Sequence, residues 1–178
     1  MANKKLMEKK MKKIFILCFL FLFYVASLYA DKTSNLFVIE RSKNANIVKY
    51  DVVLTDTGKI NEKNPIDAYW LLYAKKNGER EELSSFDKKA YGFKITYNKE
   101  NGKYDFVLKA VKDKPMILGL YNNVPKAVIK INNIDCFLEK VYIESKDGAL
   151  GIPKVSYYEL FGKEVSTGKA QQQKILVK

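Results

Sequence analysis

The sequence predicts an all-β fold, a single antiparallel β-barrel or sandwich of eight to ten strands with one short helix. Short runs rich in β-branched and aromatic residues alternate with polar residues, which is the two-residue period of a half-buried strand. Turn-forming residues separate the runs about every 8 to 12 residues, as in sandwiches and barrels. No segment shows a long apolar repeat of helical period. The pattern therefore favours an antiparallel architecture over an α/β fold.

The predicted strands begin at residue 36 and are separated by polar turns. Val48, Tyr50 and Val52 alternate with Lys49 and Asp51, so we expect one face of this strand to be buried. Similar apolar runs define the other strands. We expect strands at residues 36–41, 48–54, 66–74, 91–97, 104–110, 116–121, 126–131, 134–144 and 155–161.

Turn chemistry connects neighbouring strands. Asn101-Gly102 predicts a hairpin because both residues tolerate a positive φ, and Asn132-Asn133 predicts a second tight turn. The one helix is expected at residues 81–90, where Leu83, Phe86 and Ala90 recur at helical spacing. Longer loops are expected at residues 56–65, 112–115, 122–125 and 146–153.

A basic and then apolar N-terminal segment predicts export. Met11-Lys12-Lys13 precedes an apolar run at residues 14–26, which is the arrangement of a secretory signal peptide. A membrane-spanning helix needs about 20 apolar residues, and this run is shorter. We expect cleavage near Ala30 or a few residues earlier, so that residues 31–178 form the mature domain. The protein is then periplasmic or envelope-associated, with Met1 and Met11 as alternative start positions.

The composition excludes several classes of function. The chain has no histidine, which excludes Ser-His-Asp and Cys-His nucleophile systems and histidine-ligated metal or haem sites. Only one of the two cysteines, Cys136, lies in the predicted mature domain, so an internal disulfide is excluded there. We expect Cys136 to be a buried apolar residue. Neither a metal site nor a cofactor is predicted.

The chain is strongly basic, with 32 Lys and Arg against 20 Asp and Glu. Removing residues 1–30 takes away six lysines and one glutamate and leaves a net charge of +7. Only Arg41 and Arg80 are arginines, and arginine is the residue that makes bidentate contacts to bases and phosphates. We therefore predict no nucleic-acid partner. The lysines are interpreted as solvated faces, which are compatible with peripheral contact to an anionic surface.

The triplet Asp56-Thr57-Gly58 matches the short motif with which aspartic peptidases place a catalytic carboxylate. One copy would need a homodimer, because two carboxylates must share a proton. Thr55 and Lys59 flank the triplet where the motif prefers an apolar and a small residue. Turn chemistry alone also explains the triplet as a polar turn after a strand, and we prefer that interpretation.

Polar and aromatic residues embedded in apolar strands predict a ligand-binding site. Such residues line a pocket or form buried pairs more often than they stand exposed. The alternative is a structural ion pair between Arg41 and a carboxylate, without a functional role. No two carboxylates have a spacing that identifies them as a general acid and a general base. We therefore predict no catalytic residue. The candidate ligand-binding residues are Glu40, Arg41, Tyr50, Asp51, Asp67, Trp70 and Tyr91.

Five segments carry a resemblance that covers essentially the whole predicted mature chain. They are Phe37-Val38-Ile39-Glu40-Arg41-Ser42-Lys43-Asn44, Tyr50-Asp51, Asn64-Pro65-Ile66-Asp67-Ala68-Tyr69-Trp70, Ala90-Tyr91-Gly92-Phe93 and Tyr158-Glu159-Leu160-Phe161-Gly162. On these segments the chain resembles an uncharacterised family of secreted bacterial domains, a domain of unknown function. The resemblance implies that the Asp56 triplet is incidental, because it runs through the flanking segments and not through the triplet. It implies no substrate, cofactor or catalytic residue.

The leading hypothesis for function is an exported, noncatalytic domain that binds a small apolar or aromatic ligand or a component of the cell envelope. Two alternatives belong to other classes. One is an envelope hydrolase, either a dimeric aspartic peptidase or a carboxylate-based enzyme. The other is a purely structural envelope or surface protein. The sequence leaves open the ligand, the oligomeric state and the choice between barrel and sandwich.

Overall fold

The computed structural model describes residues 32–147 and 153–177. The predicted signal peptide, its cleavage position near Ala30 and the two start positions lie outside the described residues, as does most of the loop expected at 146–153. The elements in chain order are β1 (Lys32–Arg41), β2 (Asn44–Leu54), β3 (Ile66–Leu72), α2 (Tyr73–Lys76), β4 (Glu79–Glu82), α3 (Asp87–Tyr91), β5 (Phe93–Asn98), β6 (Lys103–Leu108), η1 (Lys109–Val111), β7 (Met116–Tyr121), β8 (Val124–Ile131), β9 (Ile134–Asp147), β10 (Pro153–Glu164) and β11 (Ala170–Leu176).

The all-β prediction is confirmed, although the described residues contain eleven strands and two short α-helices. All nine predicted strands are present and differ from the structure at most in their ends. Strands β4 and β11 are additional. Every residue of β4 is exposed, and β11 carries the polar run Gln171-Gln172-Gln173, so neither strand shows the apolar alternation by which strands are recognised in a sequence.

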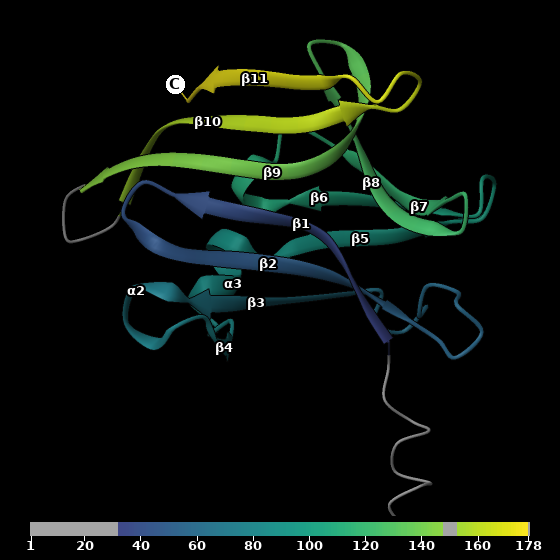
Figure 1. The fold of residues 1–178 in the computed structure, drawn as a ribbon, viewed down its shortest axis with the longest axis horizontal. Helices are drawn as coiled ribbons and strands as arrows, with labels where there is room; N and C mark the ends of the chain where they lie inside the picture. Colours follow the sequence, from purple (N-terminus) through teal and green to yellow (C-terminus); the bar gives the residue numbers. More distant parts are fainter. Residues whose placement is uncertain (1–31, 148–152, 178) are drawn as a thin grey trace, which may run out of the picture. The chain divides into compact units, whose positions relative to one another are not determined.

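All eleven strands form one sheet of order β4-β3-β2-β1-β9-β8-β7-β6-β5, with β10 and β11 branching from β9 (Figure 1). The predicted antiparallel arrangement holds for β2–β3, β3–β4, β5–β6, β6–β7, β7–β8, β8–β9, β9–β10 and β10–β11. The pair β1–β9, in contrast, is parallel. A parallel pair needs a long connection, and nearly a hundred residues of chain separate these two strands.

The sheet forks along one edge of β9. Strand β10 occupies one edge of β9 from Cys136 onward. On the other edge, the first part of β9 pairs with β8 as far as Phe137, and the later part pairs with β1 from Lys140. A register shift in the β9–β10 pairing at Phe161/Gly162 lies opposite this fork. Gly162 is required there, because a Cβ on it would lie 2.5 Å from the carbonyl oxygen of Phe137.

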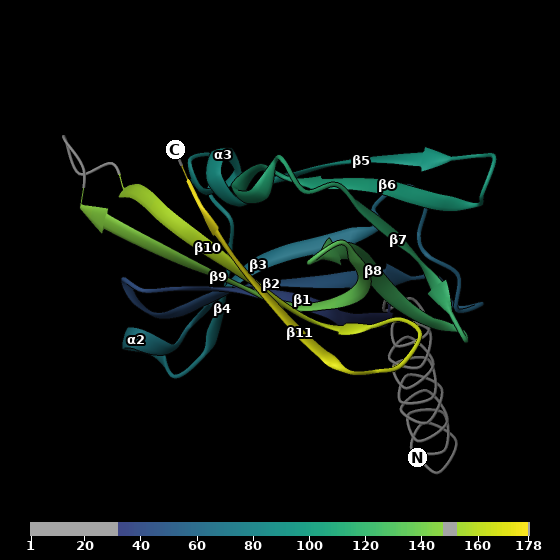
Figure 2. The same cartoon turned by 90° about the horizontal axis from the view of Figure 1, so that it is seen from above.

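The two arms of the fork face each other across the core, with β5 and β6 on one side and β1, β2 and β3 on the other (Figure 2). Phe37 of β1 lies 6.1 Å from Phe106 of β6, and Tyr50 of β2 lies 6.5 Å from Phe93 of β5, both measured between ring centroids. The sheet is thus a curled, open half-barrel and not a closed barrel. It stays open because β4 and β5 at its ends each pair with a single strand.

The helix predicted at residues 81–90 is only partly correct. Residues Glu81 and Glu82 belong to β4, where they pair with Trp70 and Tyr69 of β3. The helix α3 begins only at Asp87, after a turn that starts at Ser84. The backbone N–H and the hydroxyl of Ser84 donate to the carboxylate of Asp87, and the Asp87 N–H donates to the Ser84 hydroxyl, so these reciprocal bonds hold the turn that leads into α3.

The predicted turns are present. Asn132 and Asn133 both have positive φ, 51° and 66°, as the tight hairpin between β8 and β9 requires. The β5–β6 hairpin is also confirmed, but its turn is longer than two residues. Strand pairing stops at Asn98 and Lys103, and within the turn only Gly102 has a positive φ, of 67°.

In residues 32–147 and 153–177, neither α-helix reaches the length and apolar character of a membrane-spanning segment.

Candidate functional site

The structure distributes the seven candidate residues over two faces of the β1–β3 arm. Successive side chains of a strand point to opposite faces, so neighbours such as Glu40 and Arg41, or Tyr50 and Asp51, cannot share a face. The group on the inner face, which is turned toward β5 and β6, is Arg41, Tyr50 and Trp70, joined by Tyr91 at the end of α3. The group on the outer face is Glu40, Asp51 and Asp67.

Tyr50 anchors the inner group in the core. Its ring is fully buried and stacks on Phe37 with centroids 4.6 Å apart. Its hydroxyl donates to the backbone carbonyl of Tyr91, which ties the last residue of α3 to β2. Burial, with a smaller contribution from Tyr91, raises the pKa of Tyr50 far above the usual value for tyrosine. Tyr50 is therefore neutral at neutral pH and positions Tyr91.

Trp70 and Tyr91 form an aromatic corner that receives Arg41. Their rings meet edge to face with centroids 5.1 Å apart. The guanidinium carbon of Arg41 lies 4.4 Å from the centre of the Trp70 ring and 5.8 Å from that of Tyr91. A guanidinium over an aromatic face is stabilised by the ring quadrupole. The corner therefore holds the guanidinium close to both rings.

Arg41 has polar partners but no anionic one among the residues that the structure describes. Nη1 donates to the Tyr91 hydroxyl at 3.3 Å, and Nη2 donates to Asn44 Oδ1 at 3.0 Å. The buried Nε has no hydrogen-bond partner within the described part of the chain. A guanidinium carries five N–H groups, so three of them remain without a protein acceptor there. The structural ion pair considered for Arg41 is not found in the described ranges.

A cavity of about 250 Å³ opens beside Arg41, between α3 and the sheet. Tyr91 and Ala90 of α3 lie on one side of it, and Ile143 of β9 and Val155 of β10 lie on the other. Most of the lining is apolar. The full lining is Arg41, Lys43, Phe86, Asp87, Ala90, Tyr91, Ala110, Ile143, Ser145 and Val155.

Sequence reasoning found only two residues of this lining, Arg41 and Tyr91. The helical spacing of Phe86 and Ala90 predicts an apolar helix face, and in the structure both residues line the cavity. Ile143 and Val155 come from strands far along the chain, so no local pattern links them to Arg41.

The one carboxylate in the described lining, that of Asp87, already has a structural role. Its Oδ2 accepts hydrogen bonds from the backbone N–H of Ser84 at 3.1 Å and from the Ser84 hydroxyl. No ion pair joins Asp87 to Arg41 in the described structure. The cavity thus combines apolar walls with a guanidinium that lacks an anionic partner in this part of the chain.

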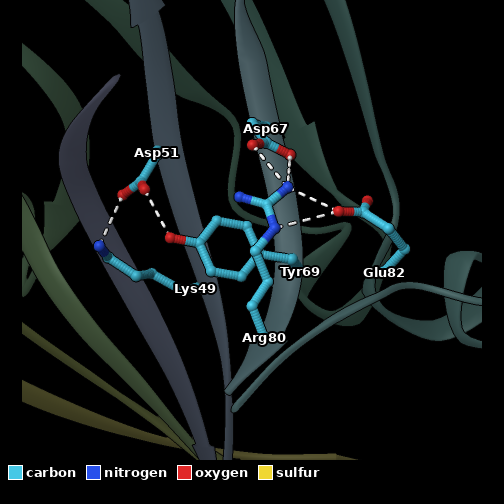
Figure 3. A network of polar contacts seen from close by, with 6 residues as sticks. All are labelled: Lys49, Asp51, Asp67, Tyr69, Arg80 and Glu82. Carbon is cyan, nitrogen blue, oxygen red and sulfur yellow. Dashed lines mark hydrogen bonds and ion pairs between the residues drawn. The ribbon is translucent and has the colours of Figure 1, made fainter. Parts of the chain in front are cut away.

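The outer face carries a closed network of opposite charges (Figure 3). Tyr69 donates to Asp51 Oδ2 at 2.7 Å, and Lys49 Nζ lies 3.2 Å from Asp51 Oδ1. Arg80 stacks on Tyr69, with its guanidinium carbon 3.8 Å from the ring centre. The Nη2 atom of Arg80 reaches Asp67 at 2.9 Å and Glu82 at 2.6 Å. Every charged group of this network thus has an opposite charge.

The protonation behaviour of the network follows from these contacts. Burial tends to lower the pKa of Lys49, but the hydrogen bond and charge of Asp51 outweigh it, and the pKa is raised. Burial and then the hydrogen bond to Asp51 raise the pKa of Tyr69, against the opposing effect of Lys49. For Arg80, burial is outweighed by Glu82 and Asp67, which raise its pKa. The network fastens β2, β3 and β4 together. Sequence reasoning predicted Asp51 and Asp67 of this network but not Lys49, Tyr69, Arg80 and Glu82.

Glu40 lies apart from both groups. Its carboxylate accepts from Lys140 of β9 at 3.0 Å, across the parallel β1–β9 pair. Both side chains are partly exposed, so the pair contributes little to stability.

Asp56 lies in a tight, exposed turn after β2. Gly58, with φ of 75°, donates its N–H to the carbonyl of Thr55 at 2.8 Å, and Thr55 donates to the carbonyl of Lys59 at 2.8 Å. The triplet thus forms a hydrogen-bonded polar turn, as turn chemistry predicts. In the described residues, no group of three or more acidic or cysteine side chains is placed to hold a metal ion.

The comparisons with known proteins give one match. The family model for a domain of unknown function (DUF4833) matches residues 37–174, which span β1 to β11. Neither the comparison with curated proteins nor that with solved structures found a match.

Proposed function

Because the chain belongs to the DUF4833 family, a domain of unknown function, we propose its role from its own geometry: an exported, noncatalytic domain that binds a small ligand in the cavity beside Arg41. The observation that carries the proposal is the state of the Arg41 guanidinium. It is held by aromatic rings and neutral acceptors at the wall of an apolar cavity, and within the described residues it has no carboxylate.

A buried guanidinium N–H group without an acceptor destabilises the protein unless a ligand accepts a hydrogen bond from it. A buried donor without an acceptor costs about 1 to 3 kcal/mol. The cost is recovered when an anion binds, since hydrogen bonds between charged groups are the strong ones. Arg80, the other arginine of the chain, shows how such a group is satisfied within the protein, by Asp67 and Glu82. An external anion would accept hydrogen bonds from the Arg41 guanidinium in the same way.

The lining indicates the class of ligand. A carboxylate matches the planar fork of N–H groups that Arg41 presents. The Tyr91 hydroxyl accepts from Arg41 and keeps its own hydrogen for donation to the same anion. The walls formed by Phe86, Ile143 and Val155 favour an apolar or aromatic body. A volume of about 250 Å³ lies at the small end of ligand pockets, so we propose a small carboxylic acid.

The noncatalytic part of the proposal rests on the polar groups of the described lining. General acid and base chemistry on a ligand needs positioned proton donors and acceptors. Asp87 is the one carboxylate in this lining, and it already accepts hydrogen bonds from Ser84, so its role is structural. A binding role uses all the features of the cavity, and a hydrolytic role lacks a second carboxylate in the described lining.

Native mass spectrometry of the exported protein, compared with its denatured mass, tests the proposal. We expect a stoichiometric mass excess that is lost on denaturation, or uptake of a carboxylate when aliphatic and aromatic monocarboxylates are added. The corresponding neutral amides serve as the matched ligand control and are expected not to bind. A protein that binds none of the carboxylates, or binds the amides as well, overturns the proposal.

Two variants test whether the ligand binds in the cavity beside Arg41. Arg41→Gln is expected to weaken carboxylate binding about tenfold to a hundredfold, because a charged hydrogen bond is worth about 1.5 to 3 kcal/mol. Arg80→Gln is the matched control, since it removes the same charge from the opposite face and is expected to leave binding unchanged. Equal loss in both variants shows that net charge, and not the cavity, attracts the ligand.

A further inference from the structure

The outer face of β6 to β9 carries a second feature, which is independent of the Arg41 cavity. Lys103 of β6, Tyr121 of β7, Lys126 of β8 and Phe137 of β9 lie on this face, with Val124 at the tip of the β7–β8 hairpin. We call these five residues the basic-aromatic surface.

Side-chain packing fixes the two lysines over the two rings. Lys103 crosses β7 at Gly119, where a Cβ would lie 3.1 Å from Lys103 Cγ, and its Nζ lies 4.6 Å from the centre of the Tyr121 ring. Lys126 Nζ lies 5.8 Å from the centre of Phe137. The two rings meet edge to face with centroids 5.2 Å apart. Each ammonium group thus lies over one ring of an aromatic pair.

The charge of this surface is not balanced within the described residues. The neighbouring lysines of the same face have acidic partners, Lys130 with Asp135 and Lys163 with Glu139, both at 2.8 Å. Lys103 and Lys126 have no such partner in residues 32–147 and 153–177. The surface therefore presents two positive charges to an outside partner.

Apolar side chains stand exposed at the same place. The β7–β8 hairpin turns at Asn122 and Asn123, both of positive φ, and Val124, which pairs with Tyr121 on this face, is 46% exposed. Ile117 on the same face of β7 is 37% exposed. An apolar tip beside aromatic rings and lysines is the composition that suits the interface between lipid head groups and acyl chains.

We propose that the basic-aromatic surface docks on an anionic lipid bilayer, with Val124 and the tip of the hairpin at the head-group boundary and Lys103 and Lys126 on lipid phosphates. Each lysine near an anionic bilayer adds about fivefold to the affinity, so the pair supplies about thirtyfold. Association of this strength is reversible and weakens with salt. Nucleic acid and soluble polyanions would use the charges but not the apolar tip, and for that reason we favour a bilayer.

Sedimentation with vesicles tests this docking. The exported protein is mixed with vesicles of phosphatidylglycerol and phosphatidylcholine, and separately with vesicles of phosphatidylcholine alone. We expect binding to the anionic vesicles only. Lys103→Gln combined with Lys126→Gln is expected to weaken it about thirtyfold, and Val124→Ser is expected to weaken it without changing the net charge. All three positions are on the surface, and circular dichroism verifies that the variants are folded.

The matched control combines Lys130→Gln with Lys163→Gln, which removes two lysines from the same face that already have acidic partners. It is expected to retain binding. Three results overturn the proposal: no binding to anionic vesicles, equal loss in the control, or equally tight binding to soluble polyphosphate with no effect of Val124→Ser. Carboxylate uptake measured on the Lys103 and Lys126 variant is expected to be unchanged, which separates a failure of docking from a failure of the proposed ligand site.

Discussion

The only two arginines of the chain lie on opposite faces of the same arm, and their surroundings differ in one respect. Both stack on an aromatic ring, Arg41 on Trp70 at 4.4 Å and Arg80 on Tyr69 at 3.8 Å. Arg80 is paired with two carboxylates, whereas Arg41 contacts only neutral acceptors among the described residues. The outer arginine completes a structural network, and the inner one has donors left for a ligand. Stacking alone therefore does not separate a structural arginine from a binding one.

The largest effect that separates the two faces is expected in alkali. Burial raises the pKa of Tyr50 above the ordinary value of about 10, so the folded state keeps this tyrosine neutral when the unfolded state ionises. A raised folded pKa gives stability that is present in full below pH 10 and is lost as pH rises further, by about 1.4 kcal/mol per pH unit for one group. Tyr69 and Tyr158 shift in the same direction. We expect the melting temperature to fall steeply above pH 10.

Two tyrosine variants sharpen this prediction. Tyr50→Phe removes the titrating group and is expected to flatten the alkaline decline, at a cost at neutral pH because the Tyr91 carbonyl loses its donor. Tyr69→Phe is expected to flatten it less, since Lys49 lies beside that hydroxyl and opposes the rise of its pKa. Thermal melts from pH 8 to 11.5 measure both variants. An unchanged alkaline slope in Tyr50→Phe contradicts the prediction.

A smaller effect is expected from the buried carboxylate of the outer face. Asp51→Asn keeps the size of the side chain but removes its charge, and the single amide oxygen can accept from only one of Lys49 and Tyr69. We expect the free energy of unfolding to fall by about 1 to 3 kcal/mol, because a buried pair is broken on one side only. Urea unfolding measures the change, and Asp56→Asn in the exposed turn serves as the control. A stability equal to that of the wild type would mean that the network contributes nothing.

The smallest effect is expected at the outer arginine. Arg80→Gln is expected to lower the free energy of unfolding by less than about 1 kcal/mol, since its side chain is 45% exposed and its ion pairs are screened by water. The decrease should shrink further in 0.5 M salt. Urea unfolding at two salt concentrations gives the comparison. A loss of several kcal/mol that salt does not change would assign to Arg80 a packing role that its exposure does not suggest.

Much of the strand pattern was predictable from local sequence. The alternation of Val48, Tyr50 and Val52 with Lys49 and Asp51 marks the strand and its inner face, although Asp51 and Val53 on the other face are buried as well. The same rule also separates the candidate residues, because Tyr50 and Asp51 are adjacent and cannot share a face. Asn132-Asn133 was predictable as a turn because few other residues adopt positive φ there.

The fork of the sheet had no local signal. It depends on β9 pairing with β8 through Phe137 and with β1 from Lys140, and β1 lies about a hundred residues earlier in the chain. Gly162 is a sequence feature that the fork requires, since only glycine fits against the Phe137 carbonyl. A glycine within a strand has several explanations, so it did not predict this one.

By itself the sequence determined the all-β class, nine of the eleven described strands and the alternation of side chains along several of them. Those properties depend on residues one or two positions apart, and the strand period fixes them. The tertiary structure alone decided that Arg80 is paired and that Arg41 faces a cavity. Charge pairing depends on the register of β3 with β4, and the cavity depends on α3 packing beside β9 and β10. Contacts between distant segments follow from the packing of the whole core, and no short stretch of the chain encodes that packing.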